Sequence, residues 1–346
     1  MRWGSSVSNS FQVKNGVRQG AVSSPILFCI YIDKLLKHLR ASTIGCQLNG
    51  VYMGIWVYAD DIILLAPSRS GLQQMTTICE RFADMYDLKF STNVDVVKSK
   101  TKCVIFSKTV IDVNSVRPIM LDNLPLPFVN EIKHLGNVLQ SDNSMTKDCS
   151  IKRACFISKI HSLNQEFYFS DPKTLMKLYN ISTCSFHGSH LWDLYCNNVV
   201  RLYSSWNMAV KVVFNLPRAT HRYFIEPISE KYHLKTMLCS RFVSFFHSLQ
   251  KSNKIAIRLL SNAFQNNLMT TLGKNIYNIA QDCNCYPSDL TKLYVKSNLT
   301  FAEVSDENFW KIPFLKELLS VRSNEIEIPG FERDELSQII NYLCCD

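Results

Sequence analysis

A pair of adjacent aspartates, Asp60 and Asp61, lies between two short apolar runs and constrains this chain more than any other feature. Residues 55–58 read IWVY, and residues 62–65 read IILL. Runs of this length, rich in β-branched and aromatic side chains, are typical of strands. A short polar break between two such runs predicts a hairpin. We therefore expect two antiparallel strands that join at a pair of carboxylates.

The carboxylate pair indicates a binding site for a cation. Two like charges at the end of an apolar sheet disfavour each other unless a cation neutralises them. Mg²⁺ suits this position, because it binds carboxylate oxygens and keeps other positions for substrate phosphates. The alternative interpretation is a solvated acidic turn, since aspartate is common in turns. The apolar flanks favour the metal site without deciding between the two.

A second segment, NGVRQGAVSSPILF at residues 15–28, combines glycines with hydrogen-bond donors. Gly16 and Gly20 permit close approach of the backbone. Arg18 and Gln19 offer donors near Ser24-Pro25, where Ser24 is expected to cap a helix that begins with proline. A helix start beside an arginine suits a phosphate. A capped loop that leads into a helix explains the same residues.

The change in hydrophobic period along the chain predicts an α+β fold in two domains, residues 1–140 and 141–346. A length of 346 residues also exceeds what one core of typical size contains. In the first domain we expect a further helix capped by Ser70 and short strands at residues 88–90 and 103–106. The second domain has helical spacing throughout, including a helix that begins at Asp171-Pro172.

Composition excludes several classes of protein. The chain is 47% hydrophobic and 19% charged, which argues against disorder. No apolar run reaches the length that spans a membrane, and the N-terminus lacks the apolar core of a signal peptide. We therefore expect a protein inside the cell, nuclear or cytoplasmic, with no membrane partner and with its 13 cysteines reduced. The net charge of +9 is compatible with a polyanionic partner.

Residues 15–28, together with YADD at 58–61, resemble the reverse transcriptases of non-LTR (LINE-type) retrotransposons. Two further segments match in the same order. Residues 98–106 resemble the strand after the helix in that family's palm, and residues 134–139 resemble the hairpin that grips the primer end.

The resemblance implies an RNA-directed DNA polymerase fold. The first domain would be a partial palm, an antiparallel sheet with helices on one face, and the second a mainly helical thumb and C-terminal region. The implied partners are an RNA template with a DNA primer, as a duplex, and deoxynucleoside triphosphates.

The resemblance also assigns roles to individual residues. Asp60 and Asp61 would bind catalytic Mg²⁺ in a two-metal site. The residues implied in nucleotide or template binding are Arg18, Gln19, Gly20, Tyr58, Lys98 and Lys100. Those implied in the primer grip are His134, Leu135 and Gly136.

The chain departs from the family at its start. The family has another essential aspartate on an upstream strand, and a fingers region before it, but no acidic residue precedes Asn15 here. We therefore expect a 5′-truncated enzyme with an incomplete metal site, which does not synthesise DNA alone. The alternative is a non-catalytic nucleic-acid-binding protein. Its basic surface would comprise residues 147–159 with Arg201, Lys211, Arg218 and Arg222.

A possible zinc site is a weaker feature of the second domain. Its four candidate ligands are Cys184, His187, His190 and Cys196. Structural zinc sites usually have closer cysteine pairs separated by a longer loop. Packing of this aromatic-rich segment in a core is therefore the better interpretation.

Overall fold

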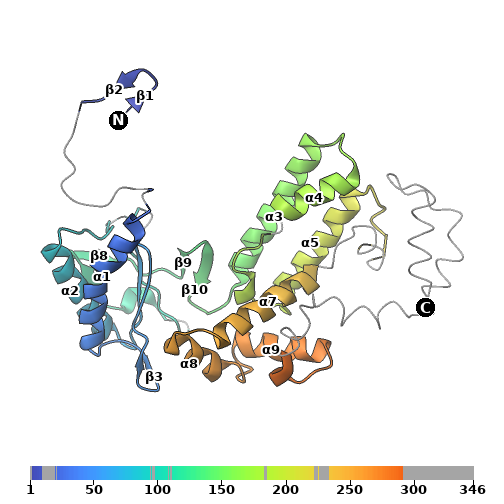
Figure 1. The fold of residues 1–346 in the computed structure, drawn as a ribbon. Helices are drawn as coiled ribbons and strands as arrows, with labels where there is room; N and C mark the ends of the chain where they lie inside the picture. The colour runs from blue at the N-terminus through green and yellow to red at the C-terminus, as the bar shows by residue number, and fades with distance from the viewer. Residues whose placement is uncertain are drawn as a thin grey trace, which may run out of the picture. The chain divides into compact units, whose positions relative to one another are not determined.

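The structure is a computed structural model that describes most of the chain in two compact units (Figure 1). The residues described are 2–9, 20, 22–93, 95, 98–107, 109, 111–182, 185–221, 225 and 234–290. One unit comprises residues 1–103 with 111–129, and the other comprises residues 104–110 with 130–346. Contacts thus divide the chain near residue 130, and the domain boundary at residue 140 stays a prediction.

The described residues of the first unit form two α-helices and short antiparallel strand pairs, which confirms the α+β class. Its elements are β1 (Arg2–Trp3), β2 (Ser6–Val7), α1 (Ser24–Ala41), β3 (Gln47–Leu48), β4 (Val51–Tyr52), β5 (Ile55–Tyr58), β6 (Asp61–Leu64), α2 (Arg69–Met85), β7 (Ile119–Leu121) and β8 (Leu124–Leu126). In the described part of this unit, the strands form four separate pairs, β1–β2, β3–β4, β5–β6 and β7–β8. The one larger antiparallel sheet that we expected is not formed by these residues.

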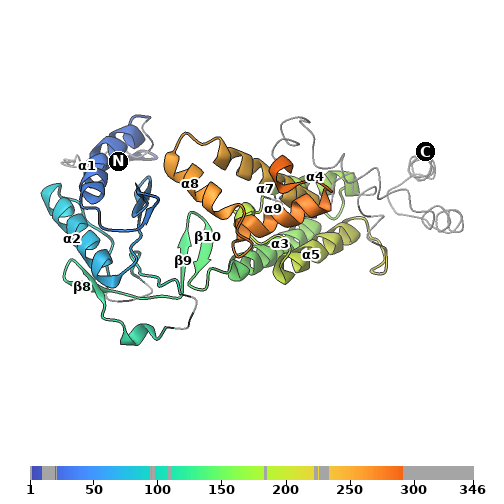
Figure 2. The same cartoon turned by 90° about the horizontal axis from the view of Figure 1, so that it is seen from below.

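Helices α1 and α2 lie side by side and share a core with the β5–β6 hairpin (Figures 1 and 2). The side chains of a strand alternate between two faces, so every second residue of each strand can join this core. The core residues contributed by the hairpin are Ile55, Val57, Ile62 and Leu64, and the buried ones from the helices are Ile32, Leu35, Leu39, Met75, Cys79 and Phe82. The helices therefore fix the hairpin from one face.

Both helices of this unit begin near the predicted residues, but with different caps. The N-cap of α2 is Ser68 and not Ser70, and the Ser68 hydroxyl accepts a hydrogen bond from the Gly71 N–H at 3.1 Å. The N-cap of α1 is Ser23 and not Ser24, and it makes no side-chain capping bond. Pro25 lies in the first turn of α1, as expected. Several serines near each start satisfy the same sequence pattern, which explains the shift.

The two strands predicted after α2 are wrong. Leu88 and Phe90 pack against the core, but residues 88–90 have no strand conformation. Cys103 makes an isolated parallel bridge to Phe128, and residues 104–106 are not in a strand. Short apolar runs can be buried by a loop as well as by a strand, and the sequence does not distinguish the two.

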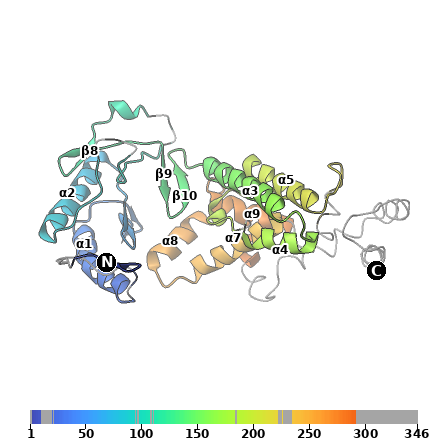
Figure 3. The same cartoon turned by 90° about the horizontal axis from the view of Figure 1, so that it is seen from above.

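In its described residues, the second unit comprises one hairpin and a set of packed helices, as its helical spacing predicts. Its elements are β9 (Glu131–His134), β10 (Asn137–Gln140), α3 (Thr146–Glu166), α4 (Pro172–Ser182), α5 (Asn197–Val213), α7 (Leu234–Gln250), α8 (Ile255–Phe264) and α9 (Thr271–Asp282). Helices α3 and α5 pack side by side (Figures 2 and 3). Asp171 caps α4, since its Oδ1 accepts a hydrogen bond from the Thr174 N–H at 3.0 Å. The largest fully buried side chains are Trp192, Trp206, Phe214 and Phe242.

Among the described helices, none is long and apolar enough to cross a membrane.

The cysteines in the described part of the chain are free thiols. Burial raises the pKa of Cys79 and Cys239 to about 12. At pH 8, a thiol of pKa 12 is about 0.01% thiolate, whereas an unperturbed thiol is roughly one-quarter thiolate. The thiolate is the form that reacts with alkylating agents.

We therefore expect iodoacetamide at pH 8 to modify the exposed Cys29 and Cys155 at least about 100-fold faster than Cys79 and Cys239. Mass spectrometry of peptides from a time course measures each rate. Equal rates for Cys29 and Cys79 in the folded protein would contradict the burial of Cys79 against α1.

Candidate metal and nucleic-acid site

The β5–β6 hairpin presents the aspartate pair at its tip. Tyr58 is the cross-strand partner of Asp61, so the turn consists of Ala59 and Asp60. Ala59 has a φ of 50°, in the left-handed region that alanine rarely adopts. A positive φ at the first residue of a two-residue turn matches the twist of the two strands. The predicted hairpin, with both carboxylates at the joined end of its strands, is thus formed.

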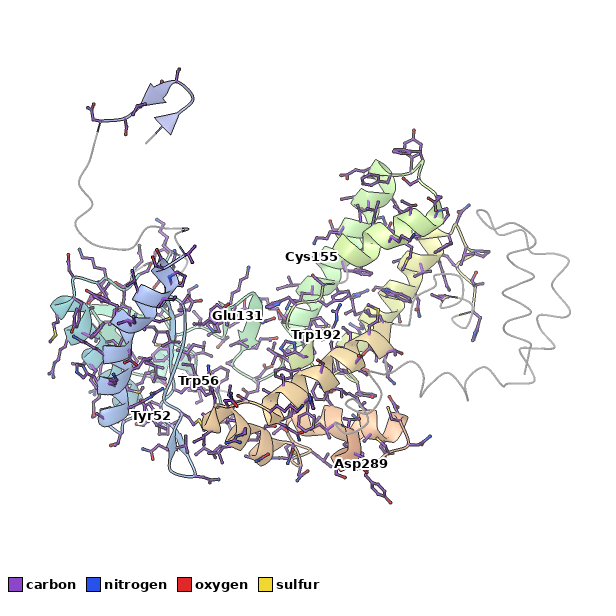
Figure 4. The ribbon with its side chains drawn as sticks, in the orientation of Figure 1. Tyr52, Trp56, Glu131, Cys155, Trp192 and Asp289 are labelled. Carbon is purple, nitrogen blue, oxygen red and sulfur yellow. The ribbon has the colours of Figure 1, made fainter. Side chains whose placement is uncertain are left out.

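One face of the hairpin packs against the helices, and the other carries exposed side chains at its tip. Tyr58 and Asp61 alternate with the core residues of their strands, so they lie on the face opposite the helices. Trp56 shares this face and donates a hydrogen bond from its Nε1 to the Met53 carbonyl at 3.0 Å (Figure 4). Tyr58 is 66% exposed, and both aspartates are exposed. A substrate could therefore approach the carboxylates and the tyrosine ring from the same side.

The two exposed carboxylates can supply some of the ligands of a hydrated divalent ion. Mg²⁺ binds through one or two carboxylates plus substrate phosphates and retains several waters. In the part of the chain that the structure describes, no three His, Cys, Asp or Glu side chains form a metal-binding group. Asp60 and Asp61 thus fit as part of a ligand set that substrate phosphates or further carboxylates would complete.

The remaining residues assigned to nucleotide or template binding lie on the segment before α1 and on the loop after α2, and only some of them are described. Arg18 and Gln19 lie outside the described residues. Gly20 has a φ of 83° and open space around its α-carbon, which fits the expected freedom of its backbone. Lys98 and Lys100 are exposed on the loop after α2, and the Nζ of Lys98 lies 3.8 Å from a carboxylate oxygen of Asp95. The substrate roles of these residues stay predictions.

The segment assigned to the primer grip forms the β9–β10 hairpin in the second unit. His134 pairs with Asn137, and Leu135 and Gly136 make the turn. Their φ angles are 46° and 79°, and two positive φ angles characterise the type I′ turn that hairpins favour. Leu135 is 41% exposed, so the tip of the hairpin is open to a ligand. The hairpin is as expected, and its contact with a primer stays a prediction.

The predicted basic surface is smaller than the sequence indicates. Lys152 is partly buried and forms an ion pair with the buried Asp148, and Lys147 forms an ion pair with Glu131. The Arg153 Nε donates to the Ser205 hydroxyl at 2.7 Å. Charges that are paired or buried contribute little to attracting phosphates. The sequence prediction counted Lys152 as a free charge. Asp148 and Lys152 lie one helical turn apart, however, a spacing at which side chains can pair.

The other members of the predicted basic surface differ in availability. Arg201 is exposed on α5, Lys211 donates to the Arg218 carbonyl at 2.7 Å, and Arg222 lies outside the described residues.

The zinc interpretation gains no support from the residues that are described. Cys184 lies outside them, and His187 places its Nε2 3.1 Å from the Leu135 carbonyl oxygen. The His190 ring lies 4.3 Å from that of Phe245, and burial lowers the pKa of His190. Cys196 packs against the core of the second unit. The three described candidates thus make separate contacts, and among the described residues they form no metal-binding group.

Comparison with known proteins identifies the class. Residues 3–136, which include the β5–β6 hairpin and its aspartates, match the family model described as reverse transcriptase (RNA-dependent DNA polymerase). This part of the chain is therefore similar to the reverse transcriptases. The family binds a nucleic-acid template and primer and uses divalent metal ions.

Relatives narrow the class to the reverse transcriptases of non-LTR retrotransposons, as the sequence motifs indicate. The chain is 35% identical over 86 residues to the Pol polyprotein of the type-2 retrotransposable element R2DM of Drosophila melanogaster, covering 25% of this chain and 8% of the relative. It is 45% identical over 58 residues to that of the type-1 element R2 of Nasonia vitripennis, covering 17% of this chain and 6% of the relative.

A third relative covers more of the chain. It is the probable RNA-directed DNA polymerase from transposon X-element of Drosophila melanogaster, 22% identical over 213 residues. This match covers 58% of the chain and 22% of the relative. The chain therefore spans less than a quarter of the length of each of these three relatives.

Proposed function

We propose that this chain carries the metal-binding palm hairpin of an RNA-directed DNA polymerase from a non-LTR retrotransposon. The observation that carries the proposal is the β5–β6 hairpin, which is buried on the helix side and presents Asp60 and Asp61 at an exposed tip. It lies within the segment that matches the reverse transcriptase family. The carboxylates are therefore accessible to an ion and a substrate, while two helices hold the strands that bear them.

The proposed metal ion is Mg²⁺, held by Asp60 and Asp61 together with substrate phosphates. When bound there, Mg²⁺ would favour attack by the primer 3′ hydroxyl and stabilise the leaving pyrophosphate. Tyr58 shares a face with Asp61, so its ring can support the primer end beside the carboxylates. Gln19 and Gly20 would contact the nucleotide, Arg18 the template, and Lys98 or Lys100 the pyrophosphate.

The proposed partner of both units is an RNA template paired with a DNA primer. Titration of a labelled RNA–DNA primer–template, followed by fluorescence anisotropy, tests this partner. Binding to phosphates releases counterions, so the affinity should fall steeply as the salt concentration rises. A chain that does not bind the duplex at low salt would contradict the proposal.

We expect no primer extension by this polypeptide alone. Its described residues supply two carboxylates at the hairpin tip without a third ligand group, whereas two-metal catalysis needs carboxylates that hold both ions. A primer-extension assay with Mg²⁺ or Mn²⁺ and labelled nucleotides measures this. Incorporation that disappears in Asp60→Asn would show that the chain assembles a complete site and that this prediction is wrong.

The alternative function is binding of nucleic acid without catalysis. Ion pairs hold Lys147 and Lys152, and a hydrogen bond holds Arg153, which weakens the surface on which this alternative depends. The Asp60→Asn variant distinguishes the proposed function from the alternative, because the two predict different binding results. Under the proposed function it lowers the metal-dependent binding of a nucleotide, whereas under the alternative it changes no binding property.

A further inference from the structure

A buried ion pair on α3 lies behind the β9–β10 hairpin. The Nζ of Lys152 is 2.8 Å from Oδ2 of Asp148, one helical turn away. The side chain of Asp148 is 2% exposed and that of Lys152 is 17% exposed. A buried ion pair loses hydration, and an apolar pair of similar volume is often as stable. The role of the pair therefore depends on the groups to which its charged atoms are hydrogen-bonded.

Asp148 joins the hairpin to the helices of the second unit. Its Oδ1 accepts a hydrogen bond from the Val138 N–H at 3.0 Å, directly on strand β10. Its Oδ2 accepts one from Nε1 of Trp192 at 2.8 Å, and Trp192 is buried among the helices (Figure 4). One carboxylate thus binds the strand, the lysine and the core tryptophan. Charge-assisted bonds of this kind are about twice as strong as neutral ones.

Lys152 contacts the hairpin at Asn137, next to the turn. Its Nζ donates to Oδ1 of Asn137 at 2.7 Å and also to the carbonyl oxygen of His187. The Nε2 of His187 in turn lies 3.1 Å from the carbonyl oxygen of Leu135. The turn is consequently held at Leu135, at Asn137 and, through Asp148, at Val138.

Gly188 shows how closely these groups are packed. It has a φ of 78°, and a β-carbon built there would lie 1.9 Å from Oδ1 of Asn137. This oxygen is the one that accepts the bond from Lys152. An alanine at residue 188 would therefore displace Asn137 from the lysine. Gly50 has a similar φ of 76° with no atom within 4 Å of such a β-carbon, so it provides a matched control.

We infer that Asp148 and Lys152 are positioning residues that fix the Leu135–Gly136 turn for contact with the 3′ end of the primer. This inference rests on the proposed function, in which the turn belongs to the primer grip. The two residues do not touch the primer themselves. They act through their bonds to Val138, Asn137 and His187, so that the exposed tip of the turn has one conformation before substrate binds.

The experiment uses an RNA–DNA primer–template with a photoreactive nucleotide at the primer 3′ end. A second duplex carries the same nucleotide ten positions upstream. Crosslinks are mapped by mass spectrometry in the full chain and in Asp148→Asn, Lys152→Met, the double variant, Gly188→Ala and Gly50→Ala. Hydrogen exchange at the peptide containing Val138 reports the order of the hairpin, and denaturant unfolding reports stability.

The wild-type chain is expected to crosslink at residues 131–140 through the terminal nucleotide and not through the upstream one. Asp148→Asn and Lys152→Met should each lower this crosslink at least tenfold and speed exchange at Val138. The double variant contains no unpaired buried charge, so its unfolding midpoint should return toward the wild-type value. Its crosslink should nevertheless stay low, because the bonds to Asn137 and His187 are lost. Gly188→Ala should lose the crosslink, and Gly50→Ala should keep it within twofold.

Two results would overturn this account, and they differ in what they reject. A wild-type chain without the terminal crosslink rejects the proposed primer contact and the inference with it. A wild-type chain that crosslinks, with a crosslink that recovers alongside stability in the double variant, rejects the inference alone. In that case the ion pair would serve folding and not the position of the turn.

Discussion

Replacing Asp60 by asparagine is expected to lower the affinity for the next deoxynucleoside triphosphate at least about 100-fold, because it removes a metal ligand. Changes to residues that merely support metal ligands already cost 10–100-fold in affinity, so loss of a ligand costs at least as much. The effect should require Mg²⁺ and a bound primer–template. Affinity for the RNA–DNA duplex should change less than about twofold, since phosphates are bound mainly by basic residues.

The measurement is anisotropy of a labelled primer–template titrated with nucleotide, with and without Mg²⁺. Asp122→Asn is a suitable control, because Asp122 is an exposed aspartate in the turn of the β7–β8 hairpin of the same unit. The control should keep the wild-type nucleotide affinity. Equal losses in Asp60→Asn and Asp122→Asn would mean that the hairpin tip of β5–β6 has no special role.

Trp206→Ala is expected to destabilise the second unit by about 3–5 kcal/mol, the usual cost of removing a buried aromatic side chain. Trp206 is 1% exposed and lies on α5 within the main core. A cost of this size is a large fraction of the 5–15 kcal/mol that stabilises a typical domain. The variant should therefore be partly unfolded near physiological temperature.

Guanidinium unfolding followed by circular dichroism, together with hydrogen exchange in α5, measures this loss. Met208 lies on the same helix but is 43% exposed, so Met208→Ala should change stability by about 0.5 kcal/mol or less. A midpoint for Trp206→Ala that equals that of Met208→Ala would contradict the packing of α5 against its neighbours.

Local pattern was sufficient to predict the hairpin that bears the aspartates. The run at residues 55–58 forms β5, and the run at 62–65 supplies most of β6, because alternation and a two-residue turn specify a hairpin without distant contacts. Met75, Cys79 and Phe82 lie at helical spacing on α2 and are buried together. These features depend on residues close together in the sequence.

The contacts behind the second hairpin could not be predicted in the same way. Asn137, Asp148 and the pair His187 and Trp192 come from three segments, and no repeat or motif links them. Lys152 counted as part of a basic surface, because composition does not reveal which charges are buried. The loop after α2 was misassigned for a related reason, since Leu88 and Phe90 reach the core without a neighbouring strand. Tertiary contacts decide both cases.

Binding of Mn²⁺ beside Trp56 tests the central claim most directly. Trp56 and Tyr58 share a face of β5, and Asp61 is opposite Tyr58, so an ion held by the aspartates lies close to the Trp56 ring. Fluorine NMR of the chain labelled with 5-fluorotryptophan gives signals for its five tryptophans, and Trp56→Phe assigns this one. We predict that Mn²⁺ broadens the Trp56 signal in the wild-type chain and leaves it sharp when Asp60 and Asp61 are both asparagine. A Trp56 signal that stays sharp in the wild-type chain, or broadens equally in the variant, would contradict the account.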